Sequence, residues 1–286
     1  MASHPTPLPP LPAVTSIAEV VSAIDTITDW AVETSSRLGY FAALYKRITI
    51  AVGTAVEDGA FEDGPRMDRL DAAFAQRYFD ALNGYFHPNR YPKPTRSWRA
   101  TFEWADKPAP ILVQHMLAGV TAHIVLDLGI AVQGLVGAGR LPSLHKDFDT
   151  INAVLASQIA GVVNDINELS PALADIYAVL QQHQIFVLNE AIRSLRDSAW
   201  RFATVLALEP GFARPPTIWA RDLQVSLAGA GRVRPTQPGR RLRSGDQGDR
   251  RARESRCGPQ RPGARPDRRD ARTDPDSVVK RRQATQ

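Results

Sequence analysis

Apolar residues recur at intervals of three and four along most of the first 230 residues. Alternating β-branched runs bounded by hairpin turns are absent, so the pattern is that of helices with one buried face rather than of strands. It predicts an all-α protein, a single bundle of about six or seven helices. The predicted helices cover residues 16–33, 36–56, 65–82, 111–136, 143–169, 170–208 and 217–227.

Polar and helix-breaking residues mark the predicted ends of these helices. Ser16 is a candidate N-cap for the first helix, and Pro65 suits the first turn of the third. Three glycines between positions 134 and 139, followed by Pro142, predict a break after the helix over 111–136. Residues 84–107 are rich in Pro, Arg and aromatic side chains and predict a long loop, a kind of segment that often covers a site.

The stretch 111–136 is almost wholly apolar and is interrupted by His115, His123 and Asp127. It approaches the length of a membrane span, but Asp127 within it would cost roughly 2.5–3.5 kcal/mol on insertion scales. We therefore expect no transmembrane segment and interpret the stretch as the buried central helix of the bundle. Burying an imidazole or a carboxylate without partners is costly, so these three side chains are the first candidates for a functional centre.

The three polar residues share one side of the central helix. His123 and Asp127 are spaced i, i+4, which places their side chains about one turn apart. Two turns, about 12 Å along the axis, separate His115 from His123. In the helix over 65–82, Asp71 lies inside the apolar stripe. In the helix that follows the central one, Asn152 lies inside the stripe and Asp149 on its flank.

Inward-facing carboxylates and histidines on neighbouring helices are how helical bundles build metal sites. One hypothesis is therefore a site that holds a divalent metal such as zinc, iron or manganese and activates water for hydrolysis. Its candidate ligands are Asp71, His123 and Asp127, with Asn152 or Asp149 as additional ligands and His115 as catalytic base or orienting group.

A structural hydrogen-bond network is the competing hypothesis. In it, Asp127 holds His123, and Asp71 pairs with Arg69 or Arg77. The protein would then be a non-catalytic bundle that binds a small apolar molecule or a protein partner. The sequence alone does not decide between the two, and whether the protein is an enzyme stays open at this stage.

The two ends differ in composition from the domain between them. Residues 1–14 form a Pro-rich lead without the features of a secretory signal, and we expect them to be disordered. The folded domain is expected over 15–228. The only cysteine, Cys257, lies beyond it, so no intramolecular disulfide forms, and we expect a cytoplasmic protein.

The net charge of +5 comes from the tail, residues 229–286. From residue 231 onward there are 17 Lys and Arg against 7 Asp and Glu, which leaves the preceding 230 residues with a net charge of −5. A segment this polar does not fold alone. It has no aromatic residue for base stacking, so a nucleic-acid partner is not favoured. An out-of-frame extension would also explain its Arg, Pro and Gly bias.

Several short motifs occur in order along the chain: RLGYFAALY at 37–45, FEDGPRMDRLD at 61–71, QH at 114–115, AHIVLDLG at 122–129, DF at 147–148 and IN at 151–152. With these motifs the chain resembles a bacterial family of uncharacterised helical proteins, domain-of-unknown-function family 5995. The resemblance covers about residues 15 to 227 and implies that Asp71, His115, His123, Asp127 and Asn152 stand at motif positions. It implies no activity, and it does not continue into the Arg-rich tail.

Overall fold

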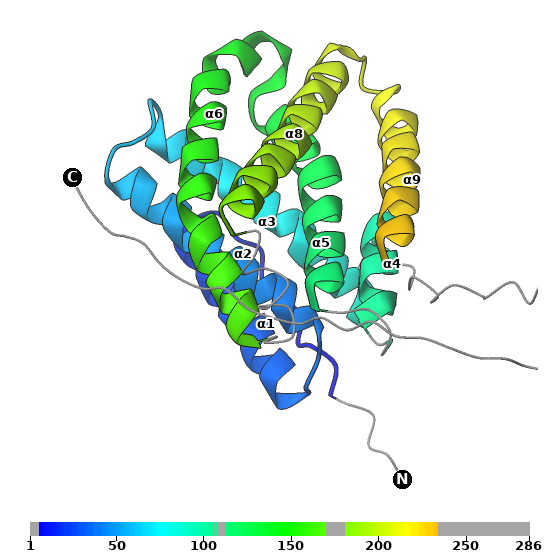
Figure 1. Ribbon diagram of the computed structural model, residues 1–286. Coiled ribbons are helices and arrows are strands. Elements are labelled where there is room, and N and C mark those ends of the chain that lie inside the picture. The colour runs from blue at the N-terminus through cyan, green and yellow to red at the C-terminus, as the bar shows by residue number, and fades with distance from the viewer. Residues whose placement is uncertain (1–5, 106, 108–111, 170–180, 234–286) are drawn as a thin grey trace, which may run out of the picture. The chain divides into compact units, whose positions relative to one another are not determined.

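The computed structural model describes residues 6–105, 107, 112–169 and 181–233. This part of the chain is folded into helices joined by short connections (Figure 1). Eight α-helices and one π-helical segment are found among these residues, with no strand, which confirms the all-α prediction. The elements are α1 (Ile17–Glu33), α2 (Leu38–Glu57), α3 (Gly64–Phe86), α4 (Arg96–Ala105), α5 (Leu112–Ala122), η1 (His123–Leu128), α6 (Gly129–Leu169), α8 (Gln181–Leu208) and α9 (Arg214–Val233).

Helices α1 and α3 begin close to their predicted positions because side-chain caps define their first turns. The Ser16 side chain caps α1 by accepting a hydrogen bond from the Glu19 N–H at 3.3 Å. The Asp63 side chain caps α3 in the same way, at 2.9 Å from the Arg66 N–H, with a proline in the first turn. Helix α3 continues past its predicted end to Phe86.

The prediction of a loop over residues 84–107 is wrong for its second half, which forms α4. Trp98 and Phe102 of this helix are buried to within 1% of full burial. They lie one turn apart and stack with ring centroids 5.3 Å apart. The aromatic residues of the segment are therefore part of the core rather than a cover over a site. Helix α4 packs against α9 (Figure 1).

The predicted break between 134 and 142 is also wrong, since α6 continues through it with Pro142 inside the helix. The element is nevertheless bent. A Cβ on Gly129 would lie 2.7 Å from Phe202 of α8, and the Phe148 ring contacts that of Trp200 on the same helix, with centroids 4.8 Å apart and the planes tilted by 50°. A straight helix would place residues 129 and 148 about 28 Å apart. They could not then both contact residues that are two positions apart on α8. Chain-breaking residues thus bend the helix without ending it.

The segment before α1 is packed against the core, although residues 1–14 were predicted to be disordered. Leu8, Leu11 and Val14 are buried. The Leu11 N–H donates to Asn83 Oδ1 at 2.8 Å, and Asn83 Nδ2 donates back to the Leu11 carbonyl at 3.0 Å. These three buried side chains and the Asn83 amide hold residues 8–14 against the helices. The predicted tail lies outside the described residues from 234 onward.

The stretch Gln114–Val136 runs through the centre of the bundle, as predicted for the central helix. By length and composition it could also cross a membrane, with a mean hydropathy of 1.6. In the structure 78% of this window is buried against the other helices. That burial is typical of the core helix of a bundle. The stretch is not uniform, because its middle turn, η1, is π-helical.

Candidate functional site

A large apolar cavity lies between α2, α3, α5, η1, α6 and α8. Its volume is about 510 Å³, within the roughly 300–1,000 Å³ typical of small-molecule sites. Its walls are formed mainly by Leu, Ile, Val, Phe and Met side chains. Among the described lining residues, polar side-chain atoms come from Tyr45, Asp71, His123 and Arg196.

Three of these residues, Tyr45, Asp71 and His123, form a polar cluster on one part of the wall. They come from α2, α3 and η1, and the rings of Tyr45 and His123 meet edge to face with centroids 4.6 Å apart. All are buried, Asp71 being 8% exposed and His123 3%. The Tyr45 hydroxyl, Asp71 Oδ2 and both ring nitrogens of His123 have no hydrogen-bond partner. The polar cluster therefore has several donors and acceptors that make no hydrogen bond within the described chain, and His123 Nδ1 comes no closer to Asp127 Oδ2 than 3.8 Å.

Burial sets the charge state of the polar cluster. It raises the pKa of Asp71 to about 7, with a further contribution from the negative charge of Asp68. Burial and then the Asp71 charge raise the pKa of the Tyr45 phenol well above 10, and the nearby Thr49 hydroxyl offsets only part of this. Burial lowers the pKa of His123 despite the opposing effect of Asp127. Up to near-neutral pH, the polar cluster is consequently predominantly uncharged.

The π-helical turn presents His123 to the cavity. Its ring stacks on Phe74 of α3, with centroids 3.5 Å apart and an angle of 8° between the planes. Phe41 of α2 meets the same ring edge to face at 5.7 Å. An α-helix changes to a π-helix at a cost in backbone hydrogen bonding, and such turns are frequent at functional sites. Two aromatic contacts thus fix the imidazole plane in place of hydrogen bonds.

Asp127 is buried deeper, at 1% exposed, and its two oxygens are used within the protein. Oδ1 accepts from Arg77 Nε at 2.8 Å, and Oδ2 accepts from Trp98 Nε1 at 2.6 Å. His123 Nδ1 is 3.8 Å from Oδ2, too far for a hydrogen bond. Burial by itself raises the pKa of Asp127, but His123, Arg77 and Trp98 together bring it below its usual value.

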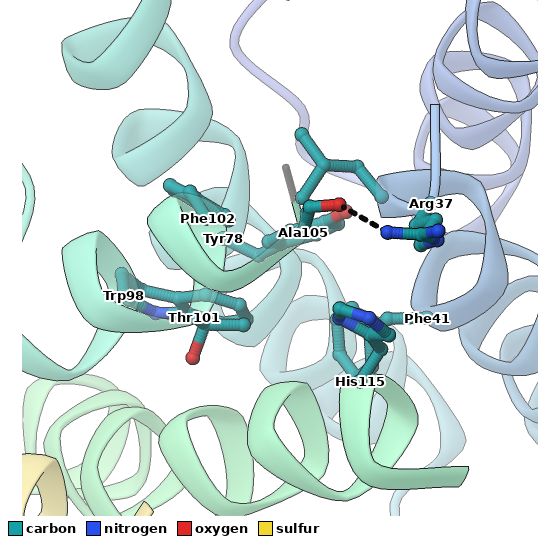
Figure 2. Close-up of a pocket in the computed structure, with 9 residues that line it drawn as sticks. Arg37, Phe41, Tyr78, Trp98, Thr101, Phe102, Ala105 and His115 are labelled. Atoms are coloured by element: carbon teal, nitrogen blue, oxygen red, sulfur yellow. Dashed lines mark hydrogen bonds between the residues drawn. The ribbon is translucent and has the colours of Figure 1, made fainter. Parts of the chain in front are cut away.

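His115 lies apart from the polar cluster. It is buried at 6% exposed and lines a separate pocket between α2, α3, α4 and α5, close to Phe41 (Figure 2). Arg37 lines one side of this pocket and donates to the Ala105 carbonyl at 3.4 Å (Figure 2). The pocket volume is about 10 Å³, room for at most about one water molecule. A substrate of ordinary size does not enter it.

The two remaining predicted residues lie near Arg196 rather than near the polar cluster. Arg196 Nε donates to Asn152 Oδ1 at 2.7 Å, and Nη2 donates to the Phe148 carbonyl at 2.6 Å. Asp149 is on the surface, half exposed, and lies 3.3 Å from His145 Nδ1. Burial lowers the pKa of Arg196 to about 10, so it stays charged at neutral pH. Asn152 thus ties α6 to α8 through Arg196.

The arrangement gives no support to the metal hypothesis. Within the described ranges, no group of three His, Cys, Asp or Glu side chains lies close enough to hold a metal ion. The network hypothesis needs a correction of its own, because Arg77 pairs with Asp127 and not with Asp71. Asp71 is left without the arginine partner that was expected for it, which is what makes the polar cluster unusual.

Sequence reasoning missed the contributions of Tyr45, Trp98 and Arg196. Tyr45 has the spacing of a core residue on its helix, so the sequence predicted only an ordinary buried aromatic there. Trp98 fell in a predicted loop. Arg196 follows the exposed Arg193 by three positions, and helical spacing alone did not show that it turns inward. A buried arginine three positions from an exposed one could have been found only from the packing of α6 on α8.

Residues 17–235 match a family described as "Family of unknown function (DUF5995)", and the chain belongs to this family. No curated protein and no solved structure matches the chain. The family assignment covers the described helices and agrees with the resemblance seen in the motifs. It names no reaction and no ligand.

Proposed function

We propose that this protein binds a small lipophilic molecule in the cavity between α2, α3, α5, η1, α6 and α8. The observation that carries the proposal is the cavity itself, about 510 Å³ in volume and lined almost entirely by apolar side chains. Close packing is the rule in protein interiors, and voids larger than a water molecule are few. The apolar wall favours an apolar occupant, since such an occupant removes apolar surface from water.

The chemistry of the wall supports binding more than catalysis. Asp127 is committed to Arg77 and Trp98, and His115 faces a pocket that is too small for a substrate. No serine, threonine or cysteine is among the described lining residues, so the cavity wall offers His123 no aliphatic hydroxyl or thiol nucleophile. Metal-assisted hydrolysis is therefore not favoured, and the geometry supports the ligand-binding alternative.

Titration of the purified protein with Nile red, a neutral lipophilic dye, tests the proposal. We expect saturable binding at one site with a blue-shifted emission, because the dye leaves water for an apolar environment. In a Leu155→Trp variant, the larger side chain projects from the cavity wall of α6 and should reduce dye affinity at least about tenfold.

Leu227→Trp is the matched control, because Leu227 is 66% exposed on α9 and does not line the cavity. This variant should bind the dye as the wild type does. If the folded wild type shows no saturable binding, or if both tryptophan variants bind equally well, the cavity is not the binding site and the proposal is wrong.

A further inference from the structure

We infer that the ligand carries a hydroxyl group, and that the polar cluster of Tyr45, Asp71 and His123 recognises it. The ligand would then be a lipophilic alcohol, its hydrocarbon part filling the apolar cavity. This inference rests on the proposed function and adds the chemical class of the molecule.

Unused hydrogen-bonding capacity at the cluster is the first argument. A buried polar group without a partner costs about 1–3 kcal/mol, and here several such groups line one cavity. Elsewhere in the described core, single atoms such as Thr49 Oγ1 and Glu209 Oε2 also lack a hydrogen bond, but other buried polar groups are paired. Asn83 exchanges two hydrogen bonds with Leu11, and Asp222 accepts from Ser97. The polar cluster differs from the other unpaired atoms because its three residues line the same cavity, where a ligand would lie.

The types of group present favour a hydroxyl. The phenol donates and accepts, a protonated Asp71 carboxyl does the same, and a neutral imidazole has one donor and one acceptor nitrogen. A hydroxyl is itself both donor and acceptor, so it can satisfy two members of the polar cluster at once. A methyl ether or a plain hydrocarbon cannot donate and would leave the acceptors unpaired.

Charged head groups fit the polar cluster less well. The wall around it consists of Phe41, Phe74 and aliphatic side chains, so an ion would lose its hydration without a fixed counter-charge. A fatty carboxylate is the main rival, because Arg196 also lines the cavity. Two of its nitrogens, however, already donate to Asn152 and Phe148, whereas the Tyr45 hydroxyl, Asp71 Oδ2 and the His123 ring nitrogens make no hydrogen bond among the described residues.

Competition against bound Nile red tests the inference with four probes of equal chain length. These are hexadecan-1-ol, its methyl ether, hexadecanoate and hexadecylamine. We expect the alcohol to displace the dye at a concentration about tenfold or more below that of each other probe, as expected for one to two hydrogen bonds. In Tyr45→Phe, the advantage of the alcohol over the ether should shrink about five- to tenfold.

Tyr45→Phe is a suitable variant because it removes only a hydroxyl that makes no hydrogen bond, so the protein should fold, and the alcohol is compared with the ether within the variant itself. Tyr78→Phe is the matched control. Tyr78 is a buried tyrosine of α3 outside the cavity lining, and its loss should leave the alcohol preference unchanged.

Each other outcome gives a distinct answer. Equal competition by the alcohol and its ether would overturn the hydroxyl inference while the cavity remains a binding site. Preference for hexadecanoate or hexadecylamine would replace the hydroxyl with a charged head group and would also overturn it. A wild type that binds neither the dye nor any probe would refute the proposed function and the inference together.

Discussion

At the scale of single residues, the buried carboxylates of this protein have opposite roles. Asp127 has an arginine and an indole N–H as partners, and these keep it ionised. Among the described residues Asp71 has no such partner, and burial raises its pKa to about 7, so that its neutral form is favoured below that pH. One carboxylate thus stabilises the fold by its charge, while the other keeps donor and acceptor atoms available at the cavity wall.

Asp71→Asn should therefore change the pH dependence of stability. The folded-state pKa of about 7 exceeds the unfolded value of 3.8. The contribution of Asp71 is accordingly full below pH 3.8 and is lost as the pH rises through 7. At pH 8 the wild type bears the cost of a buried charge, up to about 4 kcal/mol. Urea unfolding should show Asp71→Asn to be stabilising at pH 8, with a much smaller gain at pH 5.

Asp80→Asn provides the control for this comparison, since Asp80 is exposed on the same helix. Its effect on the free energy of unfolding should be the same at both pH values. A gain from Asp71→Asn that did not grow between pH 5 and pH 8 would mean that Asp71 is ionised in the folded protein over this whole range.

At the scale of helices, the close approach of η1 and α6 to α8 depends on Gly129. A Cβ at this position would lie 2.7 Å from Phe202 Cδ1 and 2.9 Å from the Ala199 carbonyl oxygen. Gly129→Ala should destabilise the protein by about 1–3 kcal/mol through overpacking, despite the better helix propensity of alanine. Chemical denaturation measures the effect directly.

Gly139→Ala on the same helix is the matched control, because its Cβ would meet no atom within 4 Å. At this position the higher helix propensity of alanine is not offset by a clash, so the free energy of unfolding should rise by up to about 1 kcal/mol. If Gly129→Ala were as stable as Gly139→Ala, the backbone contact between α6 and α8 would not depend on the glycine.

What the sequence could predict follows from the range of the interactions involved. Caps such as Ser16 and the apolar stripe around Asp71 are local, and both were predicted correctly. The bend of α6 and the helical state of residues 96–105 depend on packing against α8 and α9, which no local pattern encodes. The polar residues of the site were found because apolar neighbours surround them. Their partners were not, since Arg77 lies 50 positions from Asp127.

At the scale of the whole molecule, the ordered segment before α1 should matter more for stability than the charged tail. Leu8 and Leu11 are buried at 1% and 4% exposed, and burial of each contributes about 1.5–3 kcal/mol. Trp30 Nε1 donates to the Thr6 carbonyl at 2.7 Å, a bond that deletion would also remove. Deletion of residues 1–14 should therefore lower the free energy of unfolding by several kcal/mol.

Deletion of residues 237–286 is the comparison. Their Arg-, Pro- and Gly-rich composition predicts no folding of their own, so thermal and urea unfolding of the shortened protein should match the full chain. Deletion of residues 1–14 should also lower Nile red affinity, because the cavity lies within the helices that this segment supports. Deletion of residues 237–286 should leave it unchanged. A tail deletion that lowered stability or dye affinity as much as the deletion of residues 1–14 would show that the tail packs on the bundle, contrary to its composition.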